Sequence, residues 1–516
     1  MLASCCSGAL LGLEVTPVAV EVDIAPGLPG LQMVGLGDAA VQESRERVRS
    51  ALRNSGLKMP LTRVVVNLAP AHLRKEGPSF DLPIALGLLM ASGQLPPQAL
   101  AGVWSLGELG LDGSLRPVRG VLQVALAARA AGARALVVPD ANGAEAALVD
   151  KLSVWPAACL VEAIALLRGS SRPRAPLPLP AAVPVGTALD LADVRGQAHG
   201  RRALEIAAAG GHHLLLVGPP GSGKTMLARR LPALLPPLAR EELLEITGIH
   251  SVAGLPAVGA AWIGERPFRS PHHGCTATAL IGGGAIPRPG ELVLAHRGVL
   301  FLDELAEFRR EVLDQLRQPL EEGEVWISRA RHRSRFPCRI TLVAATNPCP
   351  CGWYGEPEAS CSCGEGLRRR YWSRLSGPLL DRIDLQVAMR RLSGAELSAP
   401  FQRCGPLASS AAPVETTAAV AARVKAARRT MAARNPGGLA NAELPAKELK
   451  RLLNIEAKAL QLWEAAIGQR RLTARAAERL LRVAQTITDL DGGREIGMGA
   501  IGEALSYRSF DQVADR

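Results

Sequence analysis

A glycine-rich loop that ends in a lysine and a hydroxyl residue is the strongest chemical signal in the sequence. The apolar run Leu214–Val217 precedes the pattern GxxxxGK plus Thr, and a helix-like run, MLARRL, follows it. Glycines in such a loop let backbone N–H groups turn toward phosphate oxygens, while the lysine adds a point charge and the hydroxyl can bind Mg²⁺. The loop consists of Gly218, Pro219, Pro220, Gly221, Ser222, Gly223, Lys224 and Thr225.

Acidic and amide side chains follow two further apolar runs, 299–302 and 342–345. Asp303 is placed to hold Mg²⁺ and Glu304 to polarise an attacking water. Asn347 is placed to contact a γ-phosphate or to position that water. Acids also favour the first turns of helices, and an Asn before Pro is often only a turn. The phosphate loop upstream favours the catalytic interpretation, which is hydrolysis of a nucleoside triphosphate.

These groups need strand ends that meet at one edge of a sheet. The three apolar runs are almost free of polar residues, which is typical of parallel strands that are buried on both faces beneath helices. We therefore expect an α/β core over residues 187–395. Residues 396–516 begin with a Ser/Ala/Pro-rich stretch and then predict helices without any strand.

The first 168 residues predict a separate α/β domain. We expect strands over 15–24, 63–68 and 135–138, and helices over 39–55 and 82–90. Repeated prolines in residues 169–186 remove backbone donors and favour an extended, semi-rigid linker. The predicted organisation is a domain over residues 1–168, a linker over 169–186, a core over 187–395 and a helical region over 396–516.

Four of the ten cysteines lie close together in the sequence, as two CxC pairs. The first pair is Cys349 and Cys351, and the second is Cys361 and Cys363. Four thiolates can close a tetrahedral Zn²⁺ site, although CxxC is the more usual spacing. The alternative is two reduced pairs without metal. The other six cysteines are scattered, which is typical of a reducing compartment rather than of a disulfide framework.

A basic segment precedes the third apolar run. Residues 324–335 predict a β-hairpin, and strand alternation places four arginines on one of its faces: Arg329, Arg331, Arg333 and Arg335. Such a face can follow nucleic-acid phosphates without sequence preference, and the alternative is an exposed charged hairpin without a ligand. The net charge of +12 also favours a polyanionic partner. The aromatic content of 3% argues against wide stacking platforms for single strands.

Several motifs together resemble those of AAA+ ATPases, namely DVRGQ at 193–197, GPPGSGKT, FLDEL and ATN. Longer stretches narrow the resemblance to one branch. PHHGCTATALIGGGAIPRPGELVLAHRGVLFLDEL, NPCPCG, SGPLLDRIDL and, near the N-terminus, VEVDIAPGLPGLQMVGLGDAAVQESRERVRSAL are similar to the YifB/ComM family of magnesium-chelatase-like AAA+ ATPases. The resemblance covers nearly the whole chain.

The resemblance implies a homo-hexameric ring with ATP and Mg²⁺ at subunit interfaces. It also implies a DNA helicase that drives branch migration in natural transformation, beside a recombinase. The site residues it implies are Gln197 on the adenine side, Lys224 and Thr225 in Walker A, Asp303 and Glu304 in Walker B, Asn347 as sensor 1, Arg382 as an arginine finger and Arg475 as sensor 2 in the helical lid. A guanidinium from a neighbouring subunit can stabilise transition-state charge. The alternatives are a surface salt bridge for Arg382 and a solvated helix face for Arg475.

The segment KEGPSFDL at 75–82, with GEL at 107–109, resembles the Lon-type protease fold. Ser79 falls where that family has its nucleophile. The activating lysine of the family is expected within residues 120–130, which contain no lysine. Because a serine needs an adjacent base to become nucleophilic, we expect a structural domain without peptidase activity.

We expect a cytoplasmic protein without a membrane span. The longest uncharged stretch, 82–107, has a clean apolar part of about 14 residues, whereas a span needs about 20. The favoured function is an ATP-driven motor on DNA. The alternatives are a magnesium-chelatase motor subunit, a protein-remodelling ATPase, a non-catalytic scaffold and an ATP-dependent protease. The intact phosphate loop and acidic pair argue against the scaffold, and the missing lysine argues against the protease.

Overall fold

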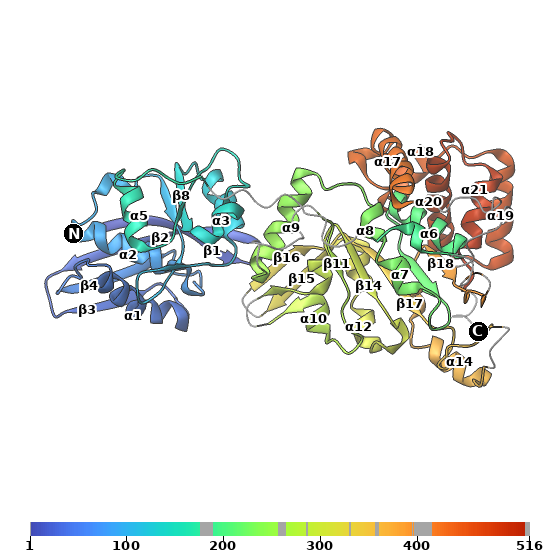
Figure 1. The fold of residues 1–516 in the computed structure, drawn as a ribbon, viewed down its shortest axis with the longest axis horizontal. Coiled ribbons are helices and arrows are strands. Elements are labelled where there is room, and N and C mark those ends of the chain that lie inside the picture. Colours follow the sequence, from blue (N-terminus) through green and yellow to red (C-terminus); the bar gives the residue numbers. More distant parts are fainter. Residues whose placement is uncertain are drawn as a thin grey trace, which may run out of the picture.

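The computed structural model describes residues 2–175, 189–255, 265–284, 287–329, 332–356, 361–394, 396 and 415–510. Figure 1 shows three parts in a row, which are an N-terminal α/β domain, a central α/β domain and a C-terminal group of helices. Most of the predicted Pro-rich linker and of the Ser/Ala/Pro-rich stretch lies outside the described residues.

The N-terminal domain is built on a seven-stranded sheet with the order β3-β4-β2-β1-β5-β8-β9. Its strands are β1 (Leu2–Leu11), β2 (Glu14–Ala25), β3 (Gly30–Val34), β4 (Arg63–Ala69), β5 (Val103–Ser105), β8 (Ala135–Pro139) and β9 (Ser153–Ala157), and a separate hairpin consists of β6 (Glu108–Leu109) and β7 (Leu115–Arg116). The helices are α1 (Ala39–Asn54), α2 (Asp81–Ala91), α3 (Val121–Ala130), α4 (Gly143–Ala146) and α5 (Leu160–Leu167). The elements expected in this domain are confirmed as β2, β4, β8, α1 and α2.

Helix α2 lies in the centre of this domain, and each of its residues is buried. Its first residue, Asp81, is fully buried as well. The Arg47 side chain of α1 donates to both carboxylate oxygens of Asp81, at 2.7 and 3.1 Å, and the Leu109 N–H donates at 3.2 Å. Because an unpaired buried carboxylate is costly, this pair fixes α1 against α2.

The central sheet has the order β11-β14-β17-β10-β18, and all of its strands run parallel. The strands are β10 (Leu214–Val217), β11 (Phe268–Arg269), β14 (Val299–Leu302), β17 (Thr341–Thr346) and β18 (Leu385–Ala388). Leu214 and Leu216 belong to one hydrophobic cluster, and Leu215 and Val217 belong to another. The prediction of a parallel sheet buried on both faces is therefore confirmed. The carboxyl ends of β10, β14 and β17 meet at one edge, where ligands bind in open α/β sheets.

Short helices and two hairpins surround this sheet. The helices are α6 (Ala198–Gly210), α7 (Lys224–Ala228), α8 (Leu231–Leu234), α9 (Arg240–Ala253), α10 (Ala277–Ile281), α11 (Glu291–Leu294), α12 (Arg310–Asp314), α13 (Arg317–Glu322), α14 (Glu365–Trp372) and α15 (Gly377–Leu380). The hairpins are β12 (Gly282–Gly283) with β13 (Arg288–Pro289), and β15 (Glu324–Arg329) with β16 (His332–Pro337). The hairpin expected over 324–335 is therefore confirmed.

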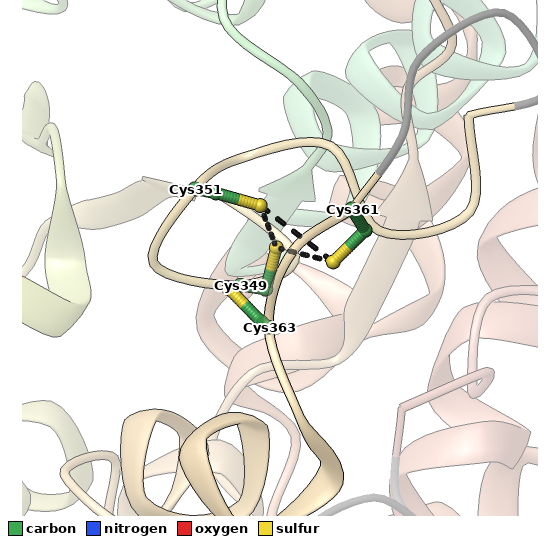
Figure 2. A group of neighbouring side chains, drawn as sticks. All are labelled: Cys349, Cys351, Cys361 and Cys363. Atoms are coloured by element: carbon green, nitrogen blue, oxygen red, sulfur yellow. Dashed lines mark hydrogen bonds between the residues drawn. The ribbon is translucent and has the colours of Figure 1, made fainter.

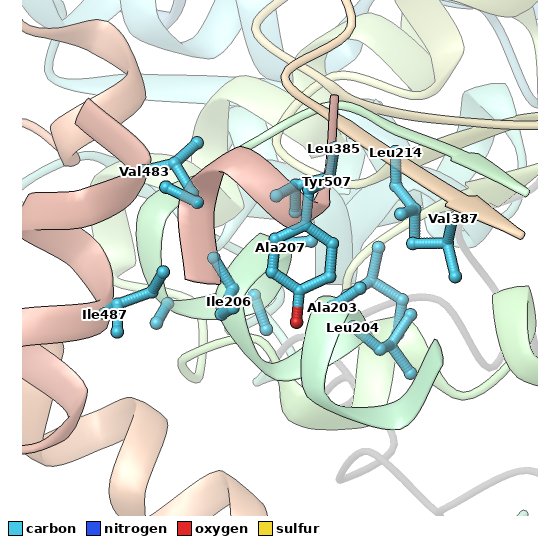
Figure 3. Close-up of a cluster of buried hydrophobic side chains, with 14 of the residues drawn as sticks. Ala203, Leu204, Ile206, Ala207, Leu214, Leu385, Val387, Val483, Ile487 and Tyr507 are labelled. Atoms are coloured by element: carbon cyan, nitrogen blue, oxygen red, sulfur yellow. The ribbon is translucent and has the colours of Figure 1, made fainter. Parts of the chain in front are cut away.

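The C-terminal part consists of α17 (Thr417–Arg434), α18 (Ala446–Leu452), α19 (Ala457–Arg470), α20 (Ala474–Leu490) and α21 (Met498–Ser506). Residues 415–510 contain no β-strand, as the sequence predicts. Figure 3 shows how this part attaches to the central domain, because Val483 and Ile487 of α20 and the buried Tyr507 share one cluster with Ile206 and Ala207 of α6. None of the described helices combines the length and the apolar composition that a membrane span requires.

Among the described residues, the N-terminal and central domains touch at the β1–β2 turn and along α9. At the β1–β2 turn, a Cβ on Gly12 would lie 2.9 Å from the Cβ of Ser334 in β16, and Leu13 packs against a cluster of the central domain. On α9, Arg240 forms an ion pair with Asp150 at 2.6 Å. The β1–β2 turn therefore lies against the buried side of the β15–β16 hairpin, whose Val325, Ile327 and Phe336 belong to that cluster of the central domain.

Candidate active site

The phosphate loop, residues 218–225, connects β10 to α7. Gly221 and Gly223 have φ angles of +77° and +88°, in the left-handed region that favours glycine. Gly218 must also be glycine, because a Cβ there would lie 2.5 Å from the carbonyl oxygen of Met389. The loop therefore uses three glycines to bend its backbone as a phosphate cradle requires.

Lys224 is surrounded by oxygen atoms. Its Nζ donates to the carbonyls of Gly218 at 2.6 Å and Pro219 at 2.9 Å, and to Oδ1 of Asn347 at 3.2 Å. Burial lowers the pKa of Lys224, and the two nearby carboxylates oppose this shift. The structure thus brings the lysine and Asn347 together from two neighbouring strands, in a place where phosphate oxygens can replace the neutral acceptors.

The two residues expected to hold Mg²⁺ are also in contact. Thr225 Oγ1 donates to Oδ2 of Asp303 at 2.9 Å. A hydroxyl and a carboxylate oxygen are the hard ligands that Mg²⁺ prefers, and Mg²⁺ usually completes its shell with water and substrate phosphates. The donor set therefore fits Mg²⁺ bound together with a nucleoside triphosphate, where the ion would neutralise charge on the phosphates.

Glu304 has a partner that sequence reasoning missed. His273 Nδ1 lies 3.1 Å from Oε2 of Glu304, and the Glu304 backbone has a φ of +52°. The His272 ring packs beside that of His273, with centroids 4.1 Å apart. A sequence signal did exist, because two histidines follow a strand parallel to β14, whose carboxyl end lies at the same edge. With only two residues, however, β11 is too short to be predicted.

We expect His273→Ala to raise ATP turnover in the absence of DNA. The imidazole of His273 pairs with one carboxylate oxygen of Glu304. Removal of the imidazole frees that oxygen to accept a proton from the attacking water. Steady-state ATPase rates at saturating ATP measure the effect. His272→Ala is the matched control, because it is His273 and not His272 that pairs with Glu304 among the described residues. A lower rate in His273→Ala would instead mean that the histidine holds Glu304 in its productive position.

Gln197 lies behind the phosphate loop. It is buried, and its Nε2 donates to the carbonyls of Ser222 at 3.1 Å and Arg390 at 2.7 Å. Gln197 therefore braces the loop against the segment that follows β18. Its assignment to the adenine side stays a prediction.

Arg382 and Arg475 meet on one carboxylate. Arg382 Nη2 lies 2.5 Å from Oε1 of Glu321, and Arg475 Nη1 lies 3.3 Å from the same atom. The Arg382 side chain is 10% exposed and that of Arg475 is 72% exposed. Within the described part of the chain, neither forms a hydrogen bond or ion pair with its own phosphate loop. The structure thus places the two arginines together and apart from Lys224, and their catalytic roles stay predictions.

The β15–β16 hairpin exposes two of its four predicted arginines on one face. Arg333 and Arg335 are exposed, while Ser334 and Phe336 between and beyond them are buried. The Arg333 guanidinium lies over the Trp326 ring at 4.1 Å, and Arg335 pairs with Glu324. Arg331 lies outside the described residues, and only the backbone of Arg329 is described.

The four clustered cysteines converge, as Figure 2 shows. Their sulfur atoms all lie within 4.8 Å of one another. The CxC spacing therefore brings both pairs to one point in space.

Ser79 lies in a short 3-10 turn, Pro78–Phe80, before α2. The nearby Lys75 is fully buried, and its Nζ donates to the carbonyl of Pro70. The segment 120–130, where the Lon-type lysine was expected, forms α3 with its N-cap Gly120 and contains no lysine. The absence of peptidase activity stays a prediction.

Comparison with known protein families finds matches over most of the chain. The family described as subunit ChlI of Mg-chelatase matches residues 20–142, magnesium chelatase subunit ChlI matches residues 190–397, and its C-terminal part matches residues 414–508. A separate match over 156 residues shows 29% identity to Lon protease 2 of Thermus thermophilus, covering 28% of this chain and 19% of that protease. This match supports the Lon-like fold of the N-terminal domain.

Two relatives align over nearly their full lengths. The protein YifB of Salmonella typhimurium is 44% identical over 505 residues, covering 98% of this chain and 96% of the relative. Competence protein ComM of Haemophilus influenzae is 43% identical over 518 residues, covering 99% of this chain and 98% of the relative. With an intact phosphate loop, acidic pair and parallel sheet, the chain belongs to the YifB/ComM family of magnesium-chelatase-like AAA+ ATPases.

Proposed function

We propose that this AAA+ ATPase is a cytoplasmic DNA motor. It assembles as a homo-hexameric ring, hydrolyses ATP with Mg²⁺ at its subunit interfaces, and drives branch migration of recombining DNA beside a recombinase during natural transformation. Its Lon-like domain is structural and has no peptidase activity. The similarity to a relative named competence protein ComM supports the proposed role in natural transformation.

The exposed face of the β15–β16 hairpin is the observation that carries the DNA assignment. Arg333 and Arg335 lie on it, and the Trp326 ring, 40% exposed, lies beneath the Arg333 guanidinium. A guanidinium held on an aromatic ring can still bind a phosphate, and the ring edge can contact a base. Together with the net charge of +12, this face suits a nucleic-acid backbone.

The position of the two assigned arginines supports assembly. Arg382 and Arg475 share Glu321 and, among the described residues, make no hydrogen bond or ion pair with the phosphate loop of their own chain. Arginines that stabilise the transition state must contact the γ-phosphate, so here the phosphate belongs to a neighbouring subunit. Hydrolysis therefore requires a ring or a comparable head-to-tail assembly.

A second candidate is a motor of the chelatase or protein-remodelling type that does not depend on DNA. The ChlI family matches favour it, because they cover all three parts of the chain. Steady-state ATPase assays without DNA, with single strands, with duplex and with a four-way junction separate the two, with Lys224→Ala as the inactive control. Stimulation by junction DNA supports the DNA motor, and rates indifferent to every DNA favour the second candidate.

The double variant Arg333→Ala/Arg335→Ala should weaken DNA binding and DNA-stimulated turnover while it leaves DNA-free turnover unchanged. Each phosphate contact that is lost reduces the slope of log K against log salt by about 0.7 to 0.9. Fluorescence anisotropy of labelled DNA over a salt series measures that slope. The matched control is Arg45→Ala/Arg451→Ala, which removes two arginines that are also exposed. Equal slopes in both double variants would mean that Arg333 and Arg335 do not contact DNA phosphates.

A further inference from the structure

The segment between Asn347 and Gly364, here called the cysteine loop, connects β17 to α14. Its described residues, 347–356 and 361–364, form no helix or strand. A loop of this length in a compact domain needs another source of order, since its described residues lack the hydrogen bonds of regular structure. All four clustered cysteines, here called the four-cysteine cluster, lie in this loop.

The four-cysteine cluster has the dimensions of a tetrahedral metal site. The Cys349 sulfur lies 3.3 Å from that of Cys351 and 3.7 Å from that of Cys361, and the latter two sulfurs are 3.6 Å apart. Sulfurs placed about 2.3 Å from a central Zn²⁺ ion form a tetrahedron with edges of about 3.8 Å. All four cysteines are free thiols, so they are available as ligands.

Core packing does not account for the cluster. The buried Cys5 and Cys338 belong to hydrophobic clusters and donate to backbone carbonyls. The buried Cys349 and Cys363, in contrast, belong to none of the hydrophobic clusters found in the described residues, although they are 0% and 7% exposed. Their sulfurs converge with those of the other two cysteines of the cluster instead.

We propose that the four-cysteine cluster binds one Zn²⁺ ion, and that this ion holds the cysteine loop against the phosphate loop. Thiolates are soft ligands, which select zinc over the Mg²⁺ of the nucleotide site. The site is structural, because four protein ligands close the tetrahedron and leave no position for substrate. The zinc site stands independently of the proposed DNA motor, whereas its effect on turnover rests on the role of Asn347 in ATP hydrolysis.

Contacts at its start, end and middle connect the cysteine loop to its surroundings. At its start, Pro348 accepts a hydrogen bond from Trp372 Nε1 at 3.1 Å, and at its end Cys363 accepts one from Arg368 Nη1 at 2.8 Å. In its middle, Gly352 has a φ of +84°, and a Cβ there would lie 2.7 Å from Cδ of Pro220 in the phosphate loop. The backbone of the cysteine loop therefore rests directly on the phosphate loop.

The position of Asn347 follows from this arrangement. Asn347 is two residues before Cys349, and its Oδ1 accepts from Lys224 at 3.2 Å. An ion bound at Cys349 fixes the backbone next to Asn347, while Gly352 limits how far the phosphate loop can move. Loss of the ion releases both constraints, and a shift of about 1 Å in such a group can lower a rate up to about 100-fold.

Metal content tests the site itself. Elemental analysis of the purified full chain should find one Zn²⁺ per chain in the unaltered protein and in Cys6→Ser, a control that removes an exposed cysteine outside the cluster. Cys351→Ser/Cys361→Ser should lose the ion, and Co²⁺ exchanged into the unaltered chain should show the absorption bands of tetrahedral thiolate ligation. A chain without zinc and without these cobalt bands would overturn the site, as would iron at the same stoichiometry.

Turnover tests the mechanical role. Removal of zinc by a chelator should lower kcat by about tenfold or more, and added Zn²⁺ should restore it. Gly352→Ala should keep its zinc and still lose turnover, because its Cβ collides with Pro220; thermal unfolding verifies that it is folded. Full turnover in the zinc-free chain would overturn the positioning role and leave the zinc site intact. An unaltered chain with zinc and ATPase activity, but without any response to DNA, would contradict only the DNA motor.

Discussion

Glu304→Gln is expected to bind ATP and Mg²⁺ as the unaltered chain does, and to hydrolyse ATP more slowly by a factor of about 10² to 10⁴. The amide has the size of the carboxylate but cannot accept a proton from water. Glu304 follows Asp303, which contacts Thr225, so we expect the carboxylate to stand next to the Mg²⁺ ligands without being one of them. The substitution therefore removes the base and retains the nucleotide site.

Single-turnover hydrolysis and equilibrium binding of a fluorescent ATP analogue separate the two effects. Glu307→Gln provides a matched control, because Glu307 lies three residues further on and pairs with Arg374 at the surface. Its turnover should remain close to that of the unaltered chain. If Glu304→Gln lost ATP binding as well, Glu304 would be a structural or metal-binding residue, and the assignment of the base would be wrong.

The parts of the fold that the sequence predicts are those with strong local signals. The boundaries of β10 and β14 agree with the predicted apolar runs. These two strands are buried on both faces and contain only apolar residues, so the end of the apolar run marks the end of each strand. The phosphate loop is likewise local, since its glycines and lysine act within eight residues. Residues positioned by such close neighbours can be assigned from the order of amino acids alone.

The elements and contacts that the sequence does not predict depend on residues that are distant in the chain. The first strand, β1, contains cysteine, serine and glycine, and it forms because it pairs with β2 along its whole length and with β5 at Cys6. The contact between His273 and Glu304 depends on the order of strands in the sheet. Arg475 and Glu321 lie far apart in the chain and meet only after the C-terminal helices pack on α6. Local patterns carry no information on these pairings.

Arg382→Ala is expected to lower kcat by about 10³-fold or more, while ATP binding to the same chain persists. The physical reason is that a guanidinium supplied by the neighbouring subunit neutralises charge on the transferring phosphoryl group. In the single chain this guanidinium pairs with Glu321, so loss of an ordinary salt bridge is the competing explanation. Glu321→Gln tests that explanation, because it breaks the ion pair and keeps the arginine. Thermal unfolding of both variants shows whether either has lost stability.

Mixing two inactive variants decides whether Arg382 acts between subunits. A Lys224→Ala chain cannot use its own phosphate loop but retains Arg382, whereas an Arg382→Ala chain retains its phosphate loop. In a mixed ring, an intact phosphate loop can face an intact arginine from its neighbour, so the mixture should hydrolyse ATP although neither variant does so alone. Among the described residues, Arg382 and Arg475 share Glu321 and make no hydrogen bond or ion pair with their own phosphate loop. We therefore expect the γ-phosphate that Arg382 contacts to be bound by a neighbouring subunit. The molecular mass of the mixture verifies that the two variants assemble. If the assembled mixture were as inactive as its components, Arg382 would act only by stabilising its own chain.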